Sequence, residues 1–409
     1  MLKKIIELTN KYEEETIRLR RMIHQNPELS GKEYDTSKLV EEELFKLGLE
    51  AKKIGETGLL CVLNGEGILN KEQKYKTLML RADMDALPIE EDLDLEFKSK
   101  NIGIMHACGH DVHTANLITV AKILNELKDK WSGTIKFLFQ PAEEKGAGAM
   151  DMIRNGVLKS PDVDFAMALH IMPIEKGKVL INHGNITAYS GGFIIRVKGK
   201  SAHSRKPQEG IDAINIAGHI IVSLNSILSK DISPLSRATF SIGQIIGGKA
   251  SNIIADNVEL KGMIRSLDKD AQEIIKTKTE EISKGIAKTF GGNCEFVFHE
   301  GYPSVFNDES TTKLLGNLFR ENFLDIIEDI DKRVYNKNSP DKYILKDAQP
   351  IMASEDFGFY SEQLPSIYYM VGTGDYAPGH SSTFYVDEKW IKFCTRTMLI
   401  GALKILNIQ

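Results

Sequence analysis

Apolar residues in the first 180 or so positions are spaced in two ways that alternate along the chain. Residues 39–47 and 117–124 carry apolar side chains at helical spacing, and Asp35 and Gly48 are expected to cap and to end the first helix. Runs of strand length separate and follow these stripes: Thr77 to Leu80, Gly133 to Gln140 and Val163 to Leu169. The alternation predicts an α/β domain with a mixed, mostly parallel sheet and helices on both faces.

Ionisable residues stand directly after these predicted strands. They are Asp83 and Asp85 after the first run, Glu143 and Glu144 after the second, and His170 after the third. A fourth run, Ser366 to Gly372, leads through a glycine-rich loop to His380. Ligands of open α/β sheets bind beyond the carboxyl ends of the strands, where neighbouring loops converge. Four such strand ends together predict one acidic, imidazole-rich pocket.

The middle of the chain has a different pattern. Its expected elements are strands at 191–198, 237–246, 258–267 and 294–299 and helices at 211–228 and 268–290. The order βαββαβ is that of a ferredoxin-like unit. We therefore predict an inserted α+β domain at 185–298, and a discontinuous catalytic domain at 1–184 and 299–409. The catalytic part is expected to end in a helix from about Asp387, and the charged stretch 324–346 is expected to form an exposed excursion.

Composition narrows the class of protein. The chain has 409 residues, of which 42% are hydrophobic and 27% charged, with a net charge of −5. Acidic and basic residues are interspersed, which argues against nucleic acid or an anionic membrane as partner. We see no signal peptide and no run of roughly 18 uncharged apolar residues. Cys61, Cys108, Cys294 and Cys394 are far apart, which is typical of free thiols in a reducing compartment, so we expect a cytoplasmic protein.

The densest candidate chemistry lies in the segment H-A-C-G-H-D-V-H at 106–113. Thiolate and imidazole are favoured ligands of zinc and also bind manganese, nickel or cobalt. In an extended segment Cys108 and His110 would project to the same side, and Asp111 could orient a ligating imidazole. The plain alternative is a buried free cysteine beside surface histidines, which the clustering disfavours.

A second candidate is Q-P-A-E-E at 140–144. Adjacent carboxylates at a strand end point in different directions, so one can bind metal while the other faces substrate. That division suits metal-assisted hydrolysis, in which a free carboxylate takes a proton from a metal-bound water. A lone Glu-Glu pair is usually only a solvated surface, and it is the preceding apolar strand that favours Glu143 and Glu144.

These segments resemble the M20 metallopeptidases, and in particular their amidohydrolase branch of hippurate hydrolases, N-acyl-amino-acid deacylases and auxin-conjugate hydrolases. Further matching motifs run through nearly the whole chain: R-A-D-M-D-A-L-P at 81–88, A-L-H-I-M-P at 168–173, G-K-S-A-H-S at 199–204, G-G-K-A-S-N at 247–252, A-S-E-D-F-G at 353–358 and P-G-H-S at 378–381. The resemblance implies a discontinuous catalytic domain and an inserted domain that dimerises and covers the active site.

Residue by residue, the resemblance implies two divalent metal ions per chain, which could be zinc, manganese, nickel or cobalt. Cys108 would bridge both ions. Glu144 and His380 would complete one site, and His110 and His170 the other. The implied roles of the remaining residues are Glu143 as general base, Asp85 as a support behind the ligands, His203 as a donor to the tetrahedral oxyanion, and Asn252 and Arg265 as groups that hold the substrate carboxylate.

The expected activity is hydrolysis of an N-acyl-amino acid to a carboxylate and a free amino acid. A dipeptidase or carboxypeptidase of the same family is the near alternative. A cysteine hydrolase with Cys108 as nucleophile would leave Glu144, His170 and His380 without a task, and a metal-binding protein without catalysis would not need Glu143. The expected partners are a small-molecule substrate and a second copy of the chain bound through the inserted domain.

Overall fold

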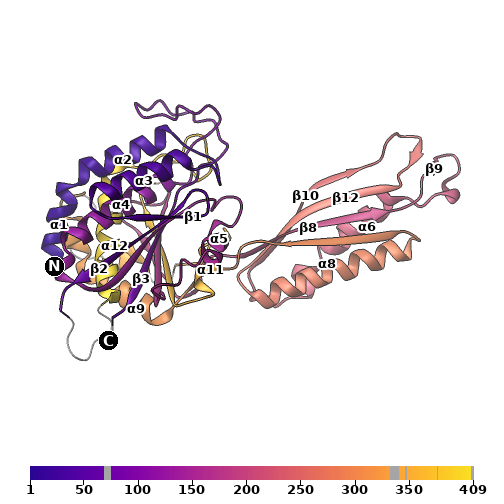
Figure 1. Cartoon of the computed structure of the whole chain (residues 1–409). Coiled ribbons are helices and arrows are strands. Elements are labelled where there is room, and N and C mark those ends of the chain that lie inside the picture. The colour runs from indigo at the N-terminus through magenta and orange to yellow at the C-terminus, as the bar shows by residue number, and fades with distance from the viewer. Residues whose placement is uncertain (69–74, 332–339, 346–347, 375, 407–409) are drawn as a thin grey trace. The chain divides into compact units, whose positions relative to one another are not determined.

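The computed structural model describes residues 1–68, 75–331, 340–345, 348–374 and 376–406, and the chain forms two compact units (Figure 1). Unit 1 contains Met1–Gly184, Phe306–Gln349 and Asp356–Gln409, and unit 2 contains Asn185–Val305 and Pro350–Glu355. Unit 2 continues past the predicted boundary at residue 298. Backbone N–H groups explain this extension, because Gly301 donates to Ser190 O (3.0 Å) and Val305 to Thr187 Oγ1 (2.8 Å).

Unit 1 is built on a mixed sheet that has eight strands within the described residues, in the order β1-β2-β4-β3-β5-β16-β6-β15. The strands are β1 (Ala51–Ile54), β2 (Gly58–Glu66), β3 (Thr77–Asp83), β4 (Ser132–Gln140), β5 (Phe165–Met172), β6 (Val179–Leu180), β15 (Ile344–Leu345) and β16 (Ser366–Gly372). The central strands β4, β3, β5 and β16 are parallel to one another, whereas β2 pairs antiparallel with β1 and β4, and β6 pairs antiparallel with β16. The predicted α/β class is confirmed.

The register of the central strands brings their carboxyl ends to one edge of the sheet. Asp83 is opposite Gln140 across β3 and β4, and His170 is opposite Met370 across β5 and β16. The loops that follow β3 and β4 therefore start side by side. This places the ionisable strand ends predicted from the sequence in one neighbourhood.

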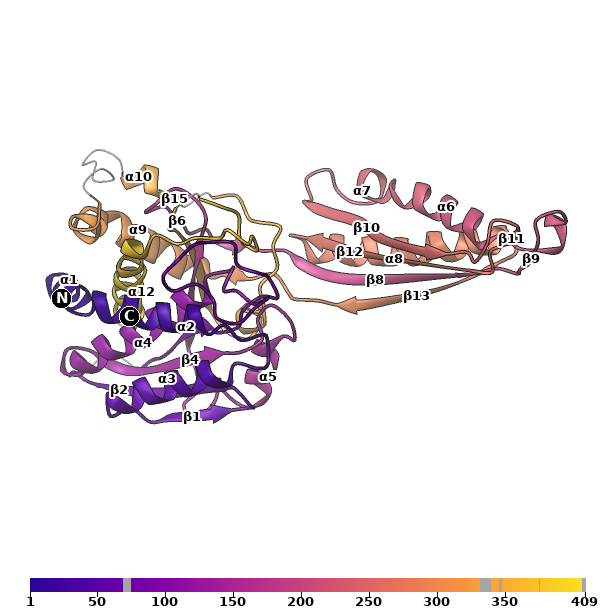
Figure 2. The ribbon, with the colours of Figure 1, turned by 90° about the horizontal axis from the view of Figure 1, so that it is seen from above.

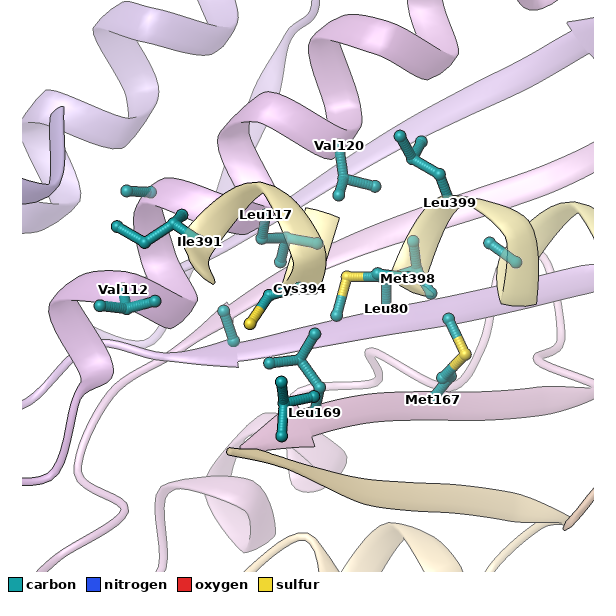
Figure 3. Close-up of a cluster of buried hydrophobic side chains, with 14 of the residues drawn as sticks. Leu80, Val112, Leu117, Val120, Met167, Leu169, Ile391, Cys394, Met398 and Leu399 are labelled. Atoms are coloured by element: carbon teal, nitrogen blue, oxygen red, sulfur yellow. The ribbon is translucent and has the colours of Figure 1, made fainter. Parts of the chain in front are cut away.

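Helices cover both faces of this sheet. The longer ones in unit 1 are α1 (Leu2–Lys11), α2 (Glu13–Gln25), α3 (Tyr34–Lys46), α4 (His110–Glu126), α9 (Glu309–Ile327) and α12 (Ile391–Leu406), and the shorter ones α5 (Gly148–Arg154), α10 (Pro340–Tyr343) and α11 (Gly358–Ser361). Helices α4 and α12 pack on β3 and β5. Figure 3 shows their buried side chains, among them Leu117 and Cys394, above Leu80 and Leu169 of the strands. On the opposite face Met152 of α5 packs against Gly58 of β2.

Two helix ends differ from the sequence prediction. Asp35 does not cap the first predicted helix, because α3 already begins at Tyr34. The carboxylate of Glu28 takes that role and accepts the N–H groups of Asp35 and Thr36 at 3.0 and 2.8 Å. Gly48 ends this helix as predicted, with a φ of 71° that favours glycine.

Unit 2 is a four-stranded antiparallel sheet with two helices packed on it (Figure 2). The sheet order is β10-β12-β8-β13, formed by β8 (Tyr189–Lys198), β10 (Ala238–Gly247), β12 (Asn257–Ser266) and β13 (Asn293–Glu300). Helix α8 (Lys269–Thr289) is continuous, whereas the first predicted helix divides into α6 (Ala213–Leu224) and α7 (Ile227–Lys230). The connection βαββαβ is the one predicted for the inserted domain.

The charged stretch 324–346 is only partly an excursion. Its first residues complete α9, with Ile326 and Ile327 buried, and Tyr343 and Ile344 are also buried. Residues 332–339 and 346, which include Asn336 and Asn338, lie outside the described residues. Among the helices that the structure describes, none is long and apolar enough to cross a membrane.

Candidate metal centre

The turn that carries Cys108 is shaped by glycine. Gly109 has a φ of 92°, a left-handed conformation, and α4 begins at the next residue, His110. A side chain at Gly109 would also collide with Ile171, whose Cδ1 lies 2.3 Å from the position of a Cβ. The prediction that Cys108 and His110 lie in one extended segment was therefore wrong, because a left-handed turn and the start of a helix separate them. Both side chains nevertheless reach the same site.

Two groups of potential metal ligands share Cys108. Its Sγ lies near the donor atoms of His110 and His170 in one group, and near those of Glu144 and His380 in the other. Within each group all donor atoms lie within 4.8 Å of one another. Cys108 Sγ is 3.4 Å from His170 Nε2, and His380 Nε2 is 3.2 Å from Glu144 Oε1. These are the two ligand sets that the family resemblance implied.

The histidines of the first group are held with one ring nitrogen directed into the site. His110 donates its Nδ1–H to the backbone oxygen of Asp85 at 2.9 Å, and His170 Nδ1 lies 2.5 Å from the backbone oxygen of Ile171. Each ring therefore presents Nε2 as the free acceptor. Nε2 of His110 is buried and has no hydrogen-bond partner among the described residues. A buried nitrogen lone pair without a donor is what a metal cation would satisfy.

Asp85 connects the two ligand groups. Its Oδ1 lies 3.2 Å from His110 Nδ1, and its Oδ2 accepts the backbone N–H of Glu144 at 3.0 Å. Ser30 donates its hydroxyl to the same Oδ2 at 2.6 Å. Asp85 thus orients the ring of one candidate ligand and fixes the backbone of another, an arrangement compatible with the supporting role expected of it.

A further buried cluster lies behind the first ligand group. His113 Nδ1 is 2.6 Å from Asp83 Oδ1, and His113 Nε2 accepts the backbone N–H of Ile171 at 3.0 Å. His113 therefore links the helix that carries His110 to the strand that carries His170. Asp83 is also paired with the Arg81 guanidinium. This pairing makes Asp83 a structural anchor for the ligand-bearing elements.

Asp111 has different partners from the predicted ones. Its Oδ2 accepts from Arg20 Nε at 2.7 Å and lies 2.8 Å from His24 Nδ1, so it does not contact a ligating imidazole. The second nitrogen of His24 is 3.2 Å from Glu91 Oε1. The prediction failed because the side chain of Asp111, one residue into α4, points to α2 rather than to the site. Asp85 performs the orienting role instead.

The charge balance of the site favours a cation. Desolvation raises the pKa of the Cys108 thiol to about 12 and, for the His170 imidazole, lowers the pKa well below its usual range. The hydrogen bond with Glu144 raises the pKa of His380. A thiol in these surroundings becomes a thiolate only beside a strong positive charge, and a neutral imidazole is the form that ligates metal. The donor set therefore fits a divalent metal ion.

Glu143 lies at the same site. Its side chain is 6% exposed, and its carboxylate belongs to a group with His110 and Glu144 whose donor atoms lie within 4.8 Å of one another. Ala142, the residue before it, has a φ of 56°, which is uncommon for any residue other than glycine. The turn lets Glu143 and Glu144 both approach the ligand groups, although adjacent residues of a strand would point to opposite faces.

The candidates in unit 2 are not all brought together. His203 is exposed on β9 (Ala202–His203), which pairs with β11 (Ile253–Ile254), and Asn252 directly precedes β11. Arg265 is near the C-terminal end of β12, whereas Asn252 lies shortly before the N-terminal end of this strand. Arg265 donates a hydrogen bond to the backbone oxygen of Met352 at 2.8 Å. The eight residue-to-residue steps from Asn257 to Arg265 span about 26 Å in a strand. Asn252 and Arg265 of one chain therefore do not contact one small carboxylate.

Comparison with known proteins identifies the family of this chain. Residues 79–400 match the model of peptidase family M20/M25/M40. The chain belongs to this family. It is 38% identical to thermostable carboxypeptidase 2 of Saccharolobus solfataricus over 416 aligned positions that cover 100% of this chain and 99% of that protein. It is 32% identical to hippurate hydrolase of Campylobacter jejuni, with 100% of both chains covered.

A solved structure extends the comparison to the metal centre. The dinuclear metal-binding M20-family peptidase of Bacillus subtilis superposes with a TM-score of 0.78 at 29% identity, covering 97% of this chain and 99% of that one. This member of the M20 family is thus a metal-dependent amide or peptide hydrolase that uses a divalent metal cofactor. The names of its relatives describe enzymes that act on N-acyl-amino acids or on peptides.

Several residues of the site were not found from the sequence. Ser30 and Glu33 contact the loops that carry Asp85 and Glu143, and Arg20 and His24 contact Asp111. Each of these partners is more than 50 residues away in the sequence, so no local spacing connects them. The only sequence signal is a concentration of polar residues in two short segments. R-R-M-I-H at 20–24 stands at the end of one helix, and E-L-S-G-K-E at 28–33 stands before the next.

Proposed function

We propose that this M20-family enzyme hydrolyses N-acyl-amino acids to a carboxylate and a free amino acid, using two divalent ions per chain. The observation that carries the proposal is the pair of ligand groups that share Cys108, with the Glu143 carboxylate beside them. Cys108 would contact both ions, with Glu144 and His380 completing one shell and His110 and His170 the other. The ions would polarise the amide carbonyl and make an attacking water more acidic.

The reaction needs one proton acceptor that is not occupied as a ligand. Glu143 would take a proton from the water that forms the new C–O bond, and would deliver that proton to the leaving nitrogen as the C–N bond breaks. Asp85 would keep the His110 ring and the Glu144 backbone in place during this exchange. The burial of Glu143 supports this role, because a carboxylate shielded from bulk water is a stronger base.

The inserted unit supplies the remaining candidates. We propose that His203 donates a hydrogen bond to the tetrahedral oxyanion in the active site of a second copy of the chain. The separation of Asn252 from Arg265 supports this arrangement, since a pocket that uses both residues would have to take them from different copies. Their proposed role is to hold the substrate carboxylate, and the enzyme would then act as a homodimer or larger assembly in the cytoplasm.

Peptide hydrolysis is the second candidate function. It is favoured by the 38% identity to a protein named as a carboxypeptidase over the whole chain. The same centre can cleave either bond, because both substrates present an amide carbonyl next to a free carboxylate. A nucleophilic Cys108 is not favoured, because it would leave Glu144 and His380 without a function.

A substrate panel tests the proposal. Release of free amine would be measured with N-acetyl, N-benzoyl and indolyl-acetyl amino acids and with dipeptides, before and after prolonged EDTA treatment. The proposal predicts turnover of at least one N-acyl series, loss of that turnover with EDTA, and recovery on adding a divalent metal. Full activity after complete removal of metal would contradict it, and cleavage of dipeptides alone would favour the second candidate.

A further inference from the structure

The segment Glu28–Glu33, between α2 and α3, touches both loops that carry the proposed catalytic groups. Ser30 donates its hydroxyl to Asp85 on the loop after β3, and Glu33 Oε1 accepts the backbone N–H of Ala142 on the loop after β4 at 3.0 Å. The backbone oxygen of Glu28 also accepts the N–H of Ala86 at 2.7 Å. One short segment thus connects two loops that are about 60 residues apart in the chain.

Glu33 is an unusual residue to find in this position. Its side chain is 0% exposed, and among the described residues no lysine or arginine forms an ion pair with it. It accepts three hydrogen bonds, from the N–H groups of Gly31 (2.7 Å) and Ala142 (3.0 Å) and from the hydroxyl of Thr57 (2.8 Å). Burying a carboxylate without a cation is costly, so a task that requires its acceptor oxygens would explain why it is there.

The strained turn beside Glu143 requires such an acceptor. A left-handed residue with a side chain costs on the order of 1 kcal/mol, and Ala142 has a φ of 56°. Its N–H is held by Glu33 and its backbone oxygen accepts the N–H of Gly148 at 3.1 Å. Without the bond to Glu33, Ala142 could relax toward an ordinary conformation, which would rotate the next residue, Glu143.

We propose that Glu33 is a positioning residue for catalysis: through the backbone of Ala142 it fixes the turn that presents Glu143 to the substrate. This inference rests on the proposed function, in which Glu143 is the general base. The hydrogen bonds of the Glu33 side chain within the described residues go to Gly31, Thr57 and Ala142, none of which is a candidate ligand. The effect of Glu33 should therefore fall on turnover and leave metal binding close to that of the wild type.

Glu33→Gln and Glu28→Gln form a matched pair of variants. Both exchange a carboxylate for an amide of the same size in the same segment, and both carboxylates accept two backbone N–H groups. Those of Glu28 belong to Asp35 and Thr36 at the start of α3, away from the site loops. In Glu33→Gln the amide NH₂ would face either the N–H groups of Gly31 and Ala142, which share Oε1, or the hydroxyl of Thr57 at Oε2, so the contact with Ala142 or with Thr57 would be lost.

The experiment compares kcat, KM, bound metal and urea unfolding in both variants, using the best N-acyl substrate of the panel. Glu33→Gln is expected to lower kcat about tenfold or more, because a small displacement of a catalytic group is costly, with KM and metal content within about twofold of the wild type. Glu28→Gln is expected to reduce stability with kcat within about twofold of the wild type. Equal changes in kcat for the two variants would overturn the inference.

A double-mutant cycle separates this inference from the proposed function. If Glu33 acts through Glu143, Glu33→Gln should not lower the residual kcat of Glu143→Gln any further. Losses that multiply would overturn the inference while the base assignment stands. An active Glu143→Gln would overturn the base assignment itself, and the positioning role with it.

A milder pair of variants covers the case in which Glu33→Gln does not fold. Thr57→Val removes the hydroxyl that fixes Glu33 while keeping the shape of the side chain, and Thr57→Ser keeps the hydroxyl. We expect a lower kcat in Thr57→Val and recovery in Thr57→Ser, with equal metal content in both. Equal kcat values in the two Thr57 variants would overturn the inference.

Discussion

The two units hold their candidate residues in opposite ways. In unit 1 the ligand groups are surrounded by buried hydrogen bonds: Asp85 contacts His110 and the backbone of Glu144, and His113 connects the elements that carry His110 and His170. In unit 2 His203 and Asn252 are exposed, and Arg265 lies near the C-terminal end of β12, in a different sheet from His203. The candidate ligands of the first unit are therefore held in a fixed geometry, whereas the candidate residues of the second are exposed or far apart.

This difference has a chemical reason. Metal ligands must converge to within a few tenths of an ångström, so their orientation has to be fixed by the protein before the ion binds. A donor that stabilises charge only in the transition state can arrive with a moving part. The contrast therefore predicts loss of bound metal for substitutions of the candidate ligands in unit 1, and an effect on turnover alone for His203.

The largest effect is expected from Glu143→Gln, which removes the proton acceptor and leaves the ligands whole. Turnover should fall about 10²–10⁴-fold while the metal content stays at the wild-type level. Glu144→Gln should instead weaken metal binding, because an amide is a poorer ligand than a carboxylate. Steady-state kinetics together with elemental analysis would check both variants. The opposite pattern would show that base and ligand are exchanged.

His203→Ala should lower kcat by about 10²–10³-fold, the usual loss for one oxyanion donor, without a change in bound metal. Mixing it with Glu143→Gln under conditions that exchange subunits should restore part of the activity, since one of the two mixed active sites would have both groups. Mixed dimers as inactive as their parents would place His203 in the active site of its own chain. Full activity of His203→Ala would make it a surface residue.

Asp85→Asn should have a smaller effect that is visible in both properties. The variant keeps the size of the side chain but weakens its hold on the His110 ring and on the Glu144 backbone, so metal affinity is expected to fall about 10–100-fold. Metal titration of the metal-free enzyme would measure this loss. The prediction fails if the affinity is unchanged while activity drops, because Asp85 would then act on the substrate.

The smallest expected effect concerns the stability of unit 1. Burial lowers the pKa of His24, but its hydrogen bonds with Asp111 and Glu91 outweigh this and raise the pKa above the ordinary 6.5. A raised pKa means that the folded state holds the proton more tightly, so the stabilisation is complete below about pH 6.5 and is lost as the pH rises through the folded value.

His24→Gln tests this directly. The loss of unfolding free energy relative to the wild type should be larger at pH 6 than at pH 9. Urea unfolding followed by tryptophan fluorescence reports on unit 1, since both tryptophans of the chain, Trp131 and Trp390, belong to it. His219→Gln, at an exposed position of unit 2, is the control. A difference that does not depend on pH would contradict the charged state of His24.

The sequence predicted the elements that carry the site better than the contacts behind it. Apolar runs fix the strands, so Glu143, His170 and His380 could be placed at strand ends before the structure was known. The start of α3 could not be predicted, because Glu28 caps it from seven residues before Asp35, outside the usual N-cap position. The partner of Asp111 could not be predicted either, because His24 is 87 residues away in the sequence. Ser30 and Glu33 escaped notice for the same reason, since polar residues between two helices are ordinarily solvated.

The central claim is that Cys108 is a ligand shared by two metal ions. Elemental analysis of carefully prepared wild-type enzyme and Cys108→Ser, together with their activities, tests it most directly. The account predicts about two divalent ions per chain in the wild type, and loss of bound metal and of activity together in the variant. A Cys108→Ser enzyme with unchanged metal content and unchanged activity would contradict it.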